Sequence, residues 1–483
     1  MHVISRTTLA MTIAILSGCA PAVHAPVAPP TSSSPAQAES GPPATPPQAG
    51  RPAPAAPVPG PAVRTLARAT LGAVGDVLMH ESVKRSAEAH GKGTPDGGYG
   101  WLFAPIADLL SEPDLTFANL ETPIAPGAGG GTREFVFNAP PEAVTALLHA
   151  GVHAVSVANN HAFDQGRAGF EETLRRLEQA RMNAIGAGPP GSAAGPLRIE
   201  VGGLAIAFLG YAHFFNQEGN GCPPPTAGKG RCVQAGQLDR TRILDDVRAA
   251  AALADAVVVS LHWGVEYEPQ PRSEDVELAH AIVEAGALVV LGHHPHVLQP
   301  IDLYRRSDGR VGVIAYSLGN FVSNQSRRYV HGATPEKVGA TRDGALLRVG
   351  LAKRDYGRGV VRVEVDGADF VPLWTDNDTA EIDRKREPER RPAIRVVAID
   401  RALDEVRAEL ARFPDPVPPS DQDRWAALRR RESLLTARRA AIASVLGEDL
   451  LRAVAPAPRE RDAPGRRPPP ASAEGRVTPR AAP

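Results

Sequence analysis

The chain has 483 residues, of which 53 are Lys or Arg and 54 are Asp or Glu, so its formal net charge is −1. Proteins that bind nucleic acid through its phosphates carry a surplus of basic residues, and this balance argues against a nucleic-acid partner. Hydrophobic residues make up 43% of the chain, which is enough for a sizeable core.

The first 19 residues have the pattern of a signal peptide. An apolar run over Leu9–Leu16 is too short to span a bilayer as a mature helix, and "LSGC" at its end resembles the lipobox of bacterial lipoproteins. In that motif Cys19 becomes the acylated N-terminus, whereas the alternative is an ordinary signal peptide with an incidental cysteine. We expect an exported lipoprotein of the cell envelope, held on the periplasmic side through its lipid, and Ala20 favours the outer membrane.

Residues 20–66 and 453–483 have compositions that do not support a folded core. The first segment is mostly Pro, Ala, Gly and Ser, and the second is rich in Pro and Arg. Neither can bury enough apolar surface to offset the entropy lost on ordering, so both are predicted to be disordered. The first would be a tether, and the folded core is predicted over residues 67–376.

A helical hairpin is predicted over residues 377–452, packed on the main domain. Its apolar residues fall on two stripes with helical spacing, which are Ile399, Leu403, Val406, Leu410 and Phe413, and then Trp425, Leu428, Leu435 and Ile442. Ser420 and Asp423 are a candidate capping pair for the second helix.

Short apolar strands of the core repeatedly end in side chains that can bind metal ions. These side chains are Asp76, Asn119, Glu121, Asn160, His161, His213, His262, His293, His294, His296 and Asn320. Helical patterns over Pro140–Ala150, Arg167–Ala180, Leu238–Leu253 and Ser273–Ala285 alternate with the strands, which predicts an α/β fold with a largely parallel sheet. Because the carboxyl ends of parallel strands lie along one edge, seven strand ends are expected to converge on one cleft.

The His-rich stretch "LGHHPH", Leu291–His296, indicates either a metal site or a solvated loop. The ligand-type residues at six other strand ends favour the metal site. Imidazole, carboxylate and amide groups without a thiolate suit divalent Mn, Zn, Fe or Co. Such a set could hold the one or two ions of a metal-dependent hydrolase.

Cys222 and Cys232 are the cysteines that remain when Cys19 is assigned to lipid. An exported protein meets oxidising conditions, which favours a disulfide between them. A zinc knuckle would need two more ligands nearby, and the intervening "PPPTAGKGR" offers none.

Six motifs, in this order along the chain, closely resemble the CapA family of capsule-synthesis proteins linked to poly-gamma-glutamate. They are "GAVGDVLMH", "FANLETPI", "SVANNHAFDQG", "VVVSLHWGVEYEPQP", "LVVLGHHPHVLQP" and "IAYSLGNFV". The resemblance implies a calcineurin-like metallophosphoesterase fold, a four-layer α/β sandwich of two mixed sheets flanked by helices. Leu78 stands where that superfamily has a second His after the Asp, and "ANLETP" replaces its second Asp motif.

The resemblance also implies roles for individual residues. The metal ligands would be Asp76, Glu121, Asn160, His262, His294 and His296. His161 would act as general acid or stabilise the transition state. The other residues of the cleft would be Asn119, Glu266, His293 and Asn320.

Two functions follow from this resemblance. The first is an envelope-anchored metal-dependent hydrolase that acts on phosphoester or capsule-polymer linkages. The second is a non-catalytic assembly or anchoring factor that binds an anionic envelope polymer, with charge from Arg133, Arg272, Arg327 and Arg328. Capsule-assembly proteins are candidate partners in both. The convergence of ligand types favours the hydrolase.

Overall fold

The computed structural model describes residues 63–128, 135–189, 196–222 and 232–452. The predicted signal peptide with Cys19, the tether up to residue 62, Arg133 and the tail over 453–483 lie outside the described residues. Among the helices within these ranges, none combines the length and the apolar character needed to cross a membrane.

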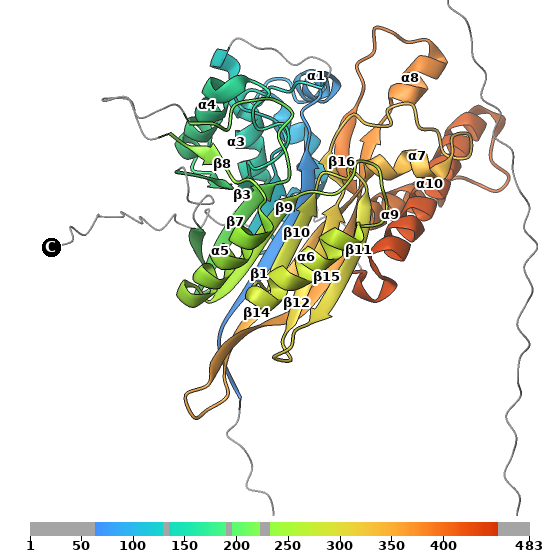
Figure 1. The fold of residues 1–483 in the computed structure, drawn as a ribbon. Helices are drawn as coiled ribbons and strands as arrows, with labels where there is room; N and C mark the ends of the chain where they lie inside the picture. Colours follow the sequence, from blue (N-terminus) through green and yellow to red (C-terminus); the bar gives the residue numbers. More distant parts are fainter. Residues whose placement is uncertain (1–62, 129–134, 190–195, 223–231, 453–483) are drawn as a thin grey trace, which may run out of the picture. The chain divides into compact units, whose positions relative to one another are not determined.

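The first of two large sheets contains the N-terminal strand at its centre (Figure 1). Its strand order is β16 (Ile394–Ala398), β15 (Val361–Asn377), β14 (Asp343–Asp355), β1 (Arg64–Val77), β2 (Leu115–Asn119), β3 (Val152–Ser156) and β4 (Asn183–Ile185), and β13 (Asn320–Val322) also pairs with β1. The pairs from β1 to β4 and the β1–β13 pair are parallel, whereas β14, β15 and β16 join in antiparallel fashion. The sheet is therefore mixed.

The second sheet is also mixed. Its order is β11 (Leu298–Arg305), β12 (Val311–Leu318), β10 (Val289–His293), β9 (Ala256–His262), β7 (Leu204–Ala212) and β6 (Leu197–Val201), and a separate ladder joins β5 (Ala187–Gly188) to β8 (Gln234–Ala235). The four central strands are parallel. The seven strand ends of interest are thus divided between two sheets, as the family resemblance implied, and do not share the edge of a single parallel sheet.

Helices cover the outer faces of both sheets (Figure 1). They are α1 (Glu81–His90), α3 (Pro141–Ala150) and α4 (Gly166–Gln179) on the first sheet, and α5 (Arg240–Leu253) and α6 (Ser273–Ala285) on the second. Apolar strand residues such as Leu71, Phe117 and Val258 pack between the sheets. The predicted four-layer sandwich is therefore confirmed, and the four predicted helices begin and end within two residues of their expected bounds.

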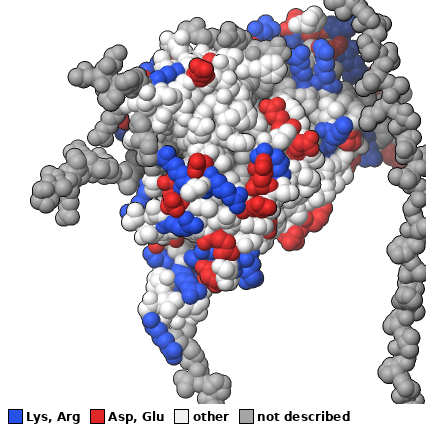
Figure 2. Space-filling view, viewed as in Figure 1, with Lys and Arg blue, Asp and Glu red and all other residues white. Residues whose placement is uncertain are grey.

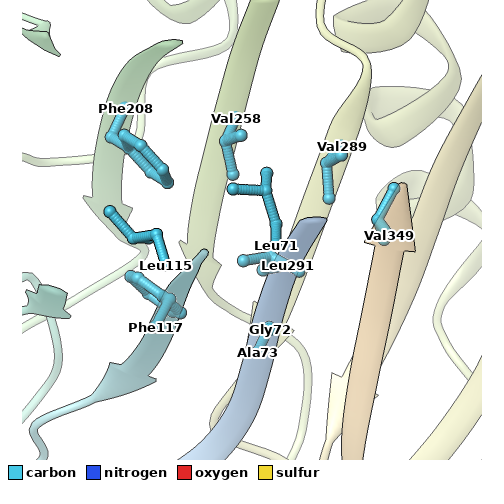
Figure 3. Close-up of a pocket in the computed structure, with 10 residues that line it drawn as sticks. All are labelled: Leu71, Gly72, Ala73, Leu115, Phe117, Phe208, Val258, Val289, Leu291 and Val349. Carbon is cyan, nitrogen blue, oxygen red and sulfur yellow. The ribbon is translucent and has the colours of Figure 1, made fainter. Parts of the chain in front are cut away.

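The space between the sheets is packed core. A small void of about 10 Å³ lies there, and its ten lining residues, among them Leu71, Phe117 and Phe208, carry no polar side chain (Figure 3). A bound water needs comparable space and several polar partners, so this void is not a ligand site.

The C-terminal segment forms two helices, α9 (Ile399–Leu410) and α10 (Gln422–Leu446), whose apolar faces share a cluster with Trp374 of β15. In Figure 1 the pair lies beside β11 and β15. The strand β16 comes just before α9 and joins the first sheet, although it lies beyond residue 376, where the core was predicted to end. Three shorter helices, α2 (Ala107–Leu110), α7 (Glu336–Gly339) and α8 (Thr379–Lys385), lie in connecting segments.

The predicted capping pair of α10 is wrong. A 3₁₀ turn over Pro419–Asp421 precedes the helix, and the residue at its N-cap, Asp421, accepts no capping hydrogen bond with its side chain. The prolines at 418 and 419 fix their φ angles and place this turn where Ser420 was expected to start the helix. The helix consequently begins at Gln422.

A disulfide joins Cys222 to Cys232, with ten residues of sequence separation. A cross-link of this size restricts the unfolded chain, so Cys222→Ser is expected to lower the free energy of unfolding by about 2–3 kcal/mol. Urea unfolding of the oxidised proteins measures this difference. Reduction of the wild type should reproduce it, and equal stability of oxidised wild type and variant would contradict the prediction.

Candidate metal centre

The register of the parallel strands places polar residues side by side within each sheet. Asp76 of β1 lies next to Asn119 of β2 and next to Asn320 of β13. In the second sheet, His262 of β9 lies next to His293 of β10. All five side chains are buried, and all but Asn320, which begins β13, lie at the carboxyl ends of their strands, where α/β sheets bind ligands.

Two glycines allow the strands to approach closely just before these residues. A Cβ on Gly75 would lie 1.9 Å from the carbonyl oxygen of Gly319, and a Cβ on Gly292 would lie 1.9 Å from that of Tyr316. Neither position can accept a side chain without moving backbone. Glycine is therefore required immediately before Asp76 and before His293.

The histidines of the loop after β10 have an unusual backbone conformation. His294 has a φ of 96° and His296 a φ of 58°, in the left-handed region that residues with a Cβ seldom adopt. The turn that results directs the loop back toward Asp76, whose Oδ2 lies 3.1 Å from His296 Nδ1 and accepts a bond of 3.3 Å from the His294 N–H. Strain of this kind is concentrated at functional sites.

Glu121 lies at the centre of the cluster and is fully buried. Its Oε1 is 3.5 Å from His262 Nε2 and 3.9 Å from the Nε2 atoms of both His161 and His296. Neither carboxylate oxygen has a hydrogen-bond partner within the described part of the chain. An unpaired buried carboxylate is costly, and a divalent cation among these imidazoles would satisfy it, so the residues fit a metal ion.

The potential ligands form three overlapping groups. Within each group, the ligand atoms all lie within 4.8 Å of one another. The groups are Glu121, His262 and His294; Asp76, Glu121 and His296; and Glu266, His294 and His296. Asn160 Oδ1 lies 2.9 Å from His262 Nε2, which places the sixth predicted ligand beside the first group. The structure thus brings all six predicted ligands together, and their role as ligands stays a prediction.

The two central carboxyl groups have pKa values shifted in opposite directions. Burial raises the pKa of Glu121 well above its usual range, and the negative charges of Asp76 and Glu266 add to this effect. Burial would also raise the pKa of Asp76, but the imidazoles of His293 and His296 outweigh it and hold that pKa well below its usual range. Asp76 is therefore ionised, while Glu121 needs a cation nearby to ionise.

Two of the imidazoles are held in the neutral form that binds metal. Burial, followed by the proximity of His294, lowers the pKa of His262 well below its usual range. Burial, followed by the proximity of His296, lowers the pKa of His294 to about 4. Neither ring needs to lose a charge to bind a metal ion at neutral pH.

His161 differs from the other histidines because a carboxylate orients it. Its Nδ1 lies 2.8 Å from Asp164 Oδ2, and its Nε2 is directed to the cluster, 3.9 Å from Glu121 Oε1. Phe137 packs edge-on against the ring at 4.6 Å, and its backbone N–H donates to the same Asp164 oxygen at 2.6 Å. This arrangement fixes the ring and leaves Nε2 able to exchange a proton at the centre.

The remaining predicted cleft residues support the cluster. Asn119 Nδ2 donates to Asp76 Oδ1 at 2.8 Å, and Asn320 Nδ2 donates to the carbonyl oxygens of His296 and Thr341 at 3.3 and 2.8 Å. The buried His293 has its Nδ1 3.4 Å from Asp76 Oδ1. His213, by contrast, is exposed and belongs to none of the three ligand groups.

Two residues of the candidate site were missed in the sequence. Asp164 had a signal, because it follows His161 by three residues within "NNHAFDQG". Phe137 had none, since an aromatic residue in a connecting segment has many structural roles. Tyr267 was not missed, because its position just past His262 predicts that it lines the substrate groove. Its ring lies 6.0 Å from that of His296, and its φ is 66°.

Comparison with known proteins agrees with this assembly. The family model "Bacterial capsule synthesis protein PGA_cap" matches residues 70–325. The chain is 31% identical over 325 residues to the PGA biosynthesis protein CapA of Bacillus subtilis, covering 66% of this chain and 77% of that protein. It is 30% identical over 311 residues to the capsule biosynthesis protein CapA of Bacillus anthracis, covering 63% of this chain and 67% of that protein.

A solved structure, TT1561 of Thermus thermophilus, covers 62% of this chain and 98% of its own, with 11% identity and a TM-score of 0.29, which is too weak to carry an argument. The family match is stronger, because it covers more than half of the sequence and contains every predicted ligand from Asp76 to His296. The helices α9 and α10 lie outside it. The chain belongs to the family of bacterial capsule synthesis proteins that the CapA resemblance predicted.

Proposed function

We propose that this protein is a divalent-metal-dependent hydrolase of capsule or exopolymer synthesis, which acts on phosphoester or polymer linkages at the cell envelope. The observation that carries the proposal is Glu121, whose buried carboxylate has no hydrogen-bond partner among the described residues and lies within 3.9 Å of three imidazoles. Binding of a polymer alone gives no reason to bury such a group.

The residues of the centre would have two different roles, metal binding and proton donation. Asp76, Glu121, Asn160, His262, His294 and His296 would hold one or two ions of Mn, Zn or Fe. A bound ion would supply Lewis-acid stabilisation of the charge that develops on the attacked group. His161, oriented by Asp164, would donate a proton from Nε2 to the leaving group.

The alternative, a non-catalytic polymer-binding factor, has less support. Arg272 bonds to both oxygens of Asp275 at 2.8 and 2.7 Å, and Arg328 lies 3.4 Å from Asp383, so these two charges are compensated. Figure 2 shows Lys and Arg side chains interleaved with Asp and Glu over the face that it draws. Such a pattern does not favour a long polyanion.

The decisive experiment removes metal with a chelator, adds back Mn²⁺, Zn²⁺ or Fe²⁺, and measures bound metal and turnover. The substrates are bis-p-nitrophenyl phosphate and poly-gamma-glutamate, the latter followed by chain length. We expect one or two ions per chain and turnover that depends on them. His262→Ala should lose both, whereas His280→Ala, whose ring bonds to Asp302 away from the centre, should lose neither. If the wild type binds none of these metals, the hydrolase proposal fails and the assembly factor replaces it.

Envelope anchoring through Cys19 is part of the same proposal. The "LSGC" step before a Pro- and Ala-rich segment supports it. In a bacterial host, Cys19→Ser is expected to move the protein from the membrane fraction to the soluble fraction and to prevent acylation, as measured by incorporation of labelled palmitate. Cys222→Ser is the matched control, because it keeps Cys19. A Cys19→Ser protein that stays with the membrane at the same mature mass would show that the anchor is elsewhere.

A further inference from the structure

A large pocket lies between the metal centre and the C-terminal helix α10. Its volume is about 800 Å³, and its walls come from four regions: the segment after β9 at Tyr267–Pro269, the start of β11, α10 from Arg438 to Val445, and the connection between β13 and β14 from Gln325 to Asp343. The first two walls follow the candidate ligands His262 and His296 directly in the sequence. The third wall lies outside the residues that match the family model.

The pocket adjoins the metal centre through Tyr267. This half-exposed side chain lines the pocket, and its ring is 6.0 Å from the ring of His296. Gln325 also lines the pocket and accepts a hydrogen bond of 2.9 Å from Asn320, which itself bonds to the carbonyl oxygen of His296. These contacts place the pocket next to the centre, with Tyr267 between them.

The charges of the pocket do not favour an anion. Its lining includes three carboxylates and two cations, which are Glu268, Glu336, Asp343, Lys337 and Arg438. Arg438 is buried and already bonds to Asp343 at 2.9 Å and to Glu336 at 3.2 Å. No surplus of positive charge is left on the described walls for a carboxylate or a second phosphate.

The remaining lining is largely apolar. Val297, Leu298, Ile442 and Val445 contribute to the walls, and Val338 is 37% exposed at the same surface. A pocket of this size that has apolar walls and no surplus charge, next to a polar reaction centre, has the features of a site for the uncharged part of a ligand.

We propose that this pocket binds an uncharged, mainly apolar substituent of a phosphoester whose phosphate lies at the metal centre. The proposal rests on the proposed function for the position of the phosphate. It assigns the choice of substituent to α10, so that this chain selects its substrate with a segment outside the matched family region.

The test compares the binding of hexylphosphonate and methylphosphonate to the full chain by calorimetry, with Mn²⁺ added and after chelation. Each buried methylene contributes about fourfold in affinity, so hexylphosphonate is expected to bind at least about tenfold tighter. Ala441→Trp fills the pocket from α10 and should reduce this preference to less than about threefold, with methylphosphonate affinity unchanged. Ala440→Trp is the matched control, because Ala440 is an exposed neighbour that does not line the pocket, and it should keep the preference.

A second pair of variants covers the case in which the tryptophan prevents folding. Val338→Asp places a charge at the pocket and should also reduce the preference, whereas Val330→Asp, at a similarly exposed valine outside the lining, should not.

Equal affinity of the two phosphonates, or tighter binding of a tetra-gamma-glutamate that competes with hexylphosphonate, would overturn the proposal. A hexyl preference that persists after chelation in a protein without turnover would uphold the pocket and reject the hydrolase. Metal-dependent turnover without any preference for the longer alkyl chain would uphold the hydrolase and reject the pocket as a binding site.

Discussion

Replacing Glu121 with Gln is expected to raise the melting temperature of the metal-free protein and to abolish the stabilisation that added metal gives. Glu121 is fully buried, and burial together with Asp76 and Glu266 raises its pKa well above the value in the unfolded chain. When the pKa of a group is higher in the folded state than in the unfolded state, the free energy of unfolding of the protein falls as the pH rises from the unfolded pKa toward the folded pKa. The metal-free wild type therefore carries this cost at neutral pH, and the amide, which does not ionise, removes it.

Thermal unfolding at pH 5 and pH 8, with chelator or with Mn²⁺, measures both effects. The advantage of the metal-free variant should grow from pH 5 to pH 8, because in that interval the unfolded chain ionises Glu121 while the folded chain keeps it protonated. Metal at 100 times its dissociation constant should stabilise the wild type by about 2.7 kcal/mol and the variant far less. Glu88→Gln, at an exposed position of α1, should change neither quantity. A Glu121→Gln protein that is less stable without metal and still gains stability from Mn²⁺ would show that this carboxyl is not a ligand.

The cluster of potential ligands was predictable from sequence because of how its strands end. Strands such as β9 and β10 are buried along their whole length, so their sequences are almost entirely apolar, and a histidine at the end of each strand is conspicuous. His262 and His293 were identified in this way. The division of these strands between two sheets was not visible in the runs themselves, because both sheets have parallel central strands with the same pattern.

Other features depend on contacts that a local pattern does not contain. The strand β16 is only five residues long and is defined by its pairing with β15, while its sequence "IRVVA" leads directly into the helical stripe of α9. The pocket beside Tyr267 requires α10, more than 150 residues away, to pack against β11. The hydrogen bond of Asp164 to His161 is local, and it was missed only because an acidic residue three positions after a His has no single meaning.

The second large effect is expected from a pair of histidine variants. His296→Ala removes a ring whose Nδ1 lies 3.1 Å from Asp76 and whose Nε2 lies 3.9 Å from Glu121, between the two central carboxylates. Loss of a residue that only supports a ligand lowers metal affinity about 10- to 100-fold, so loss of this ring should lower it by at least that much. His161→Ala removes a ring that Asp164 already holds, and it should leave bound metal unchanged while kcat falls by about 10²–10⁴.

Metal content and turnover, measured on the same preparations, separate the two roles. Excess Mn²⁺ should restore part of the activity of His296→Ala, because a weakened site can still be filled, but it should restore none in His161→Ala, where the proton donor itself is missing. Asp164→Asn should resemble His161→Ala in a milder form, since the ring remains and only its orientation is lost. If His161→Ala loses metal as His296→Ala does, His161 is a ligand, and the proton must come from another group at the centre. The half-exposed Tyr267, 6.0 Å from His296 and with its pKa raised by burial to about 12, would then be the next residue to substitute.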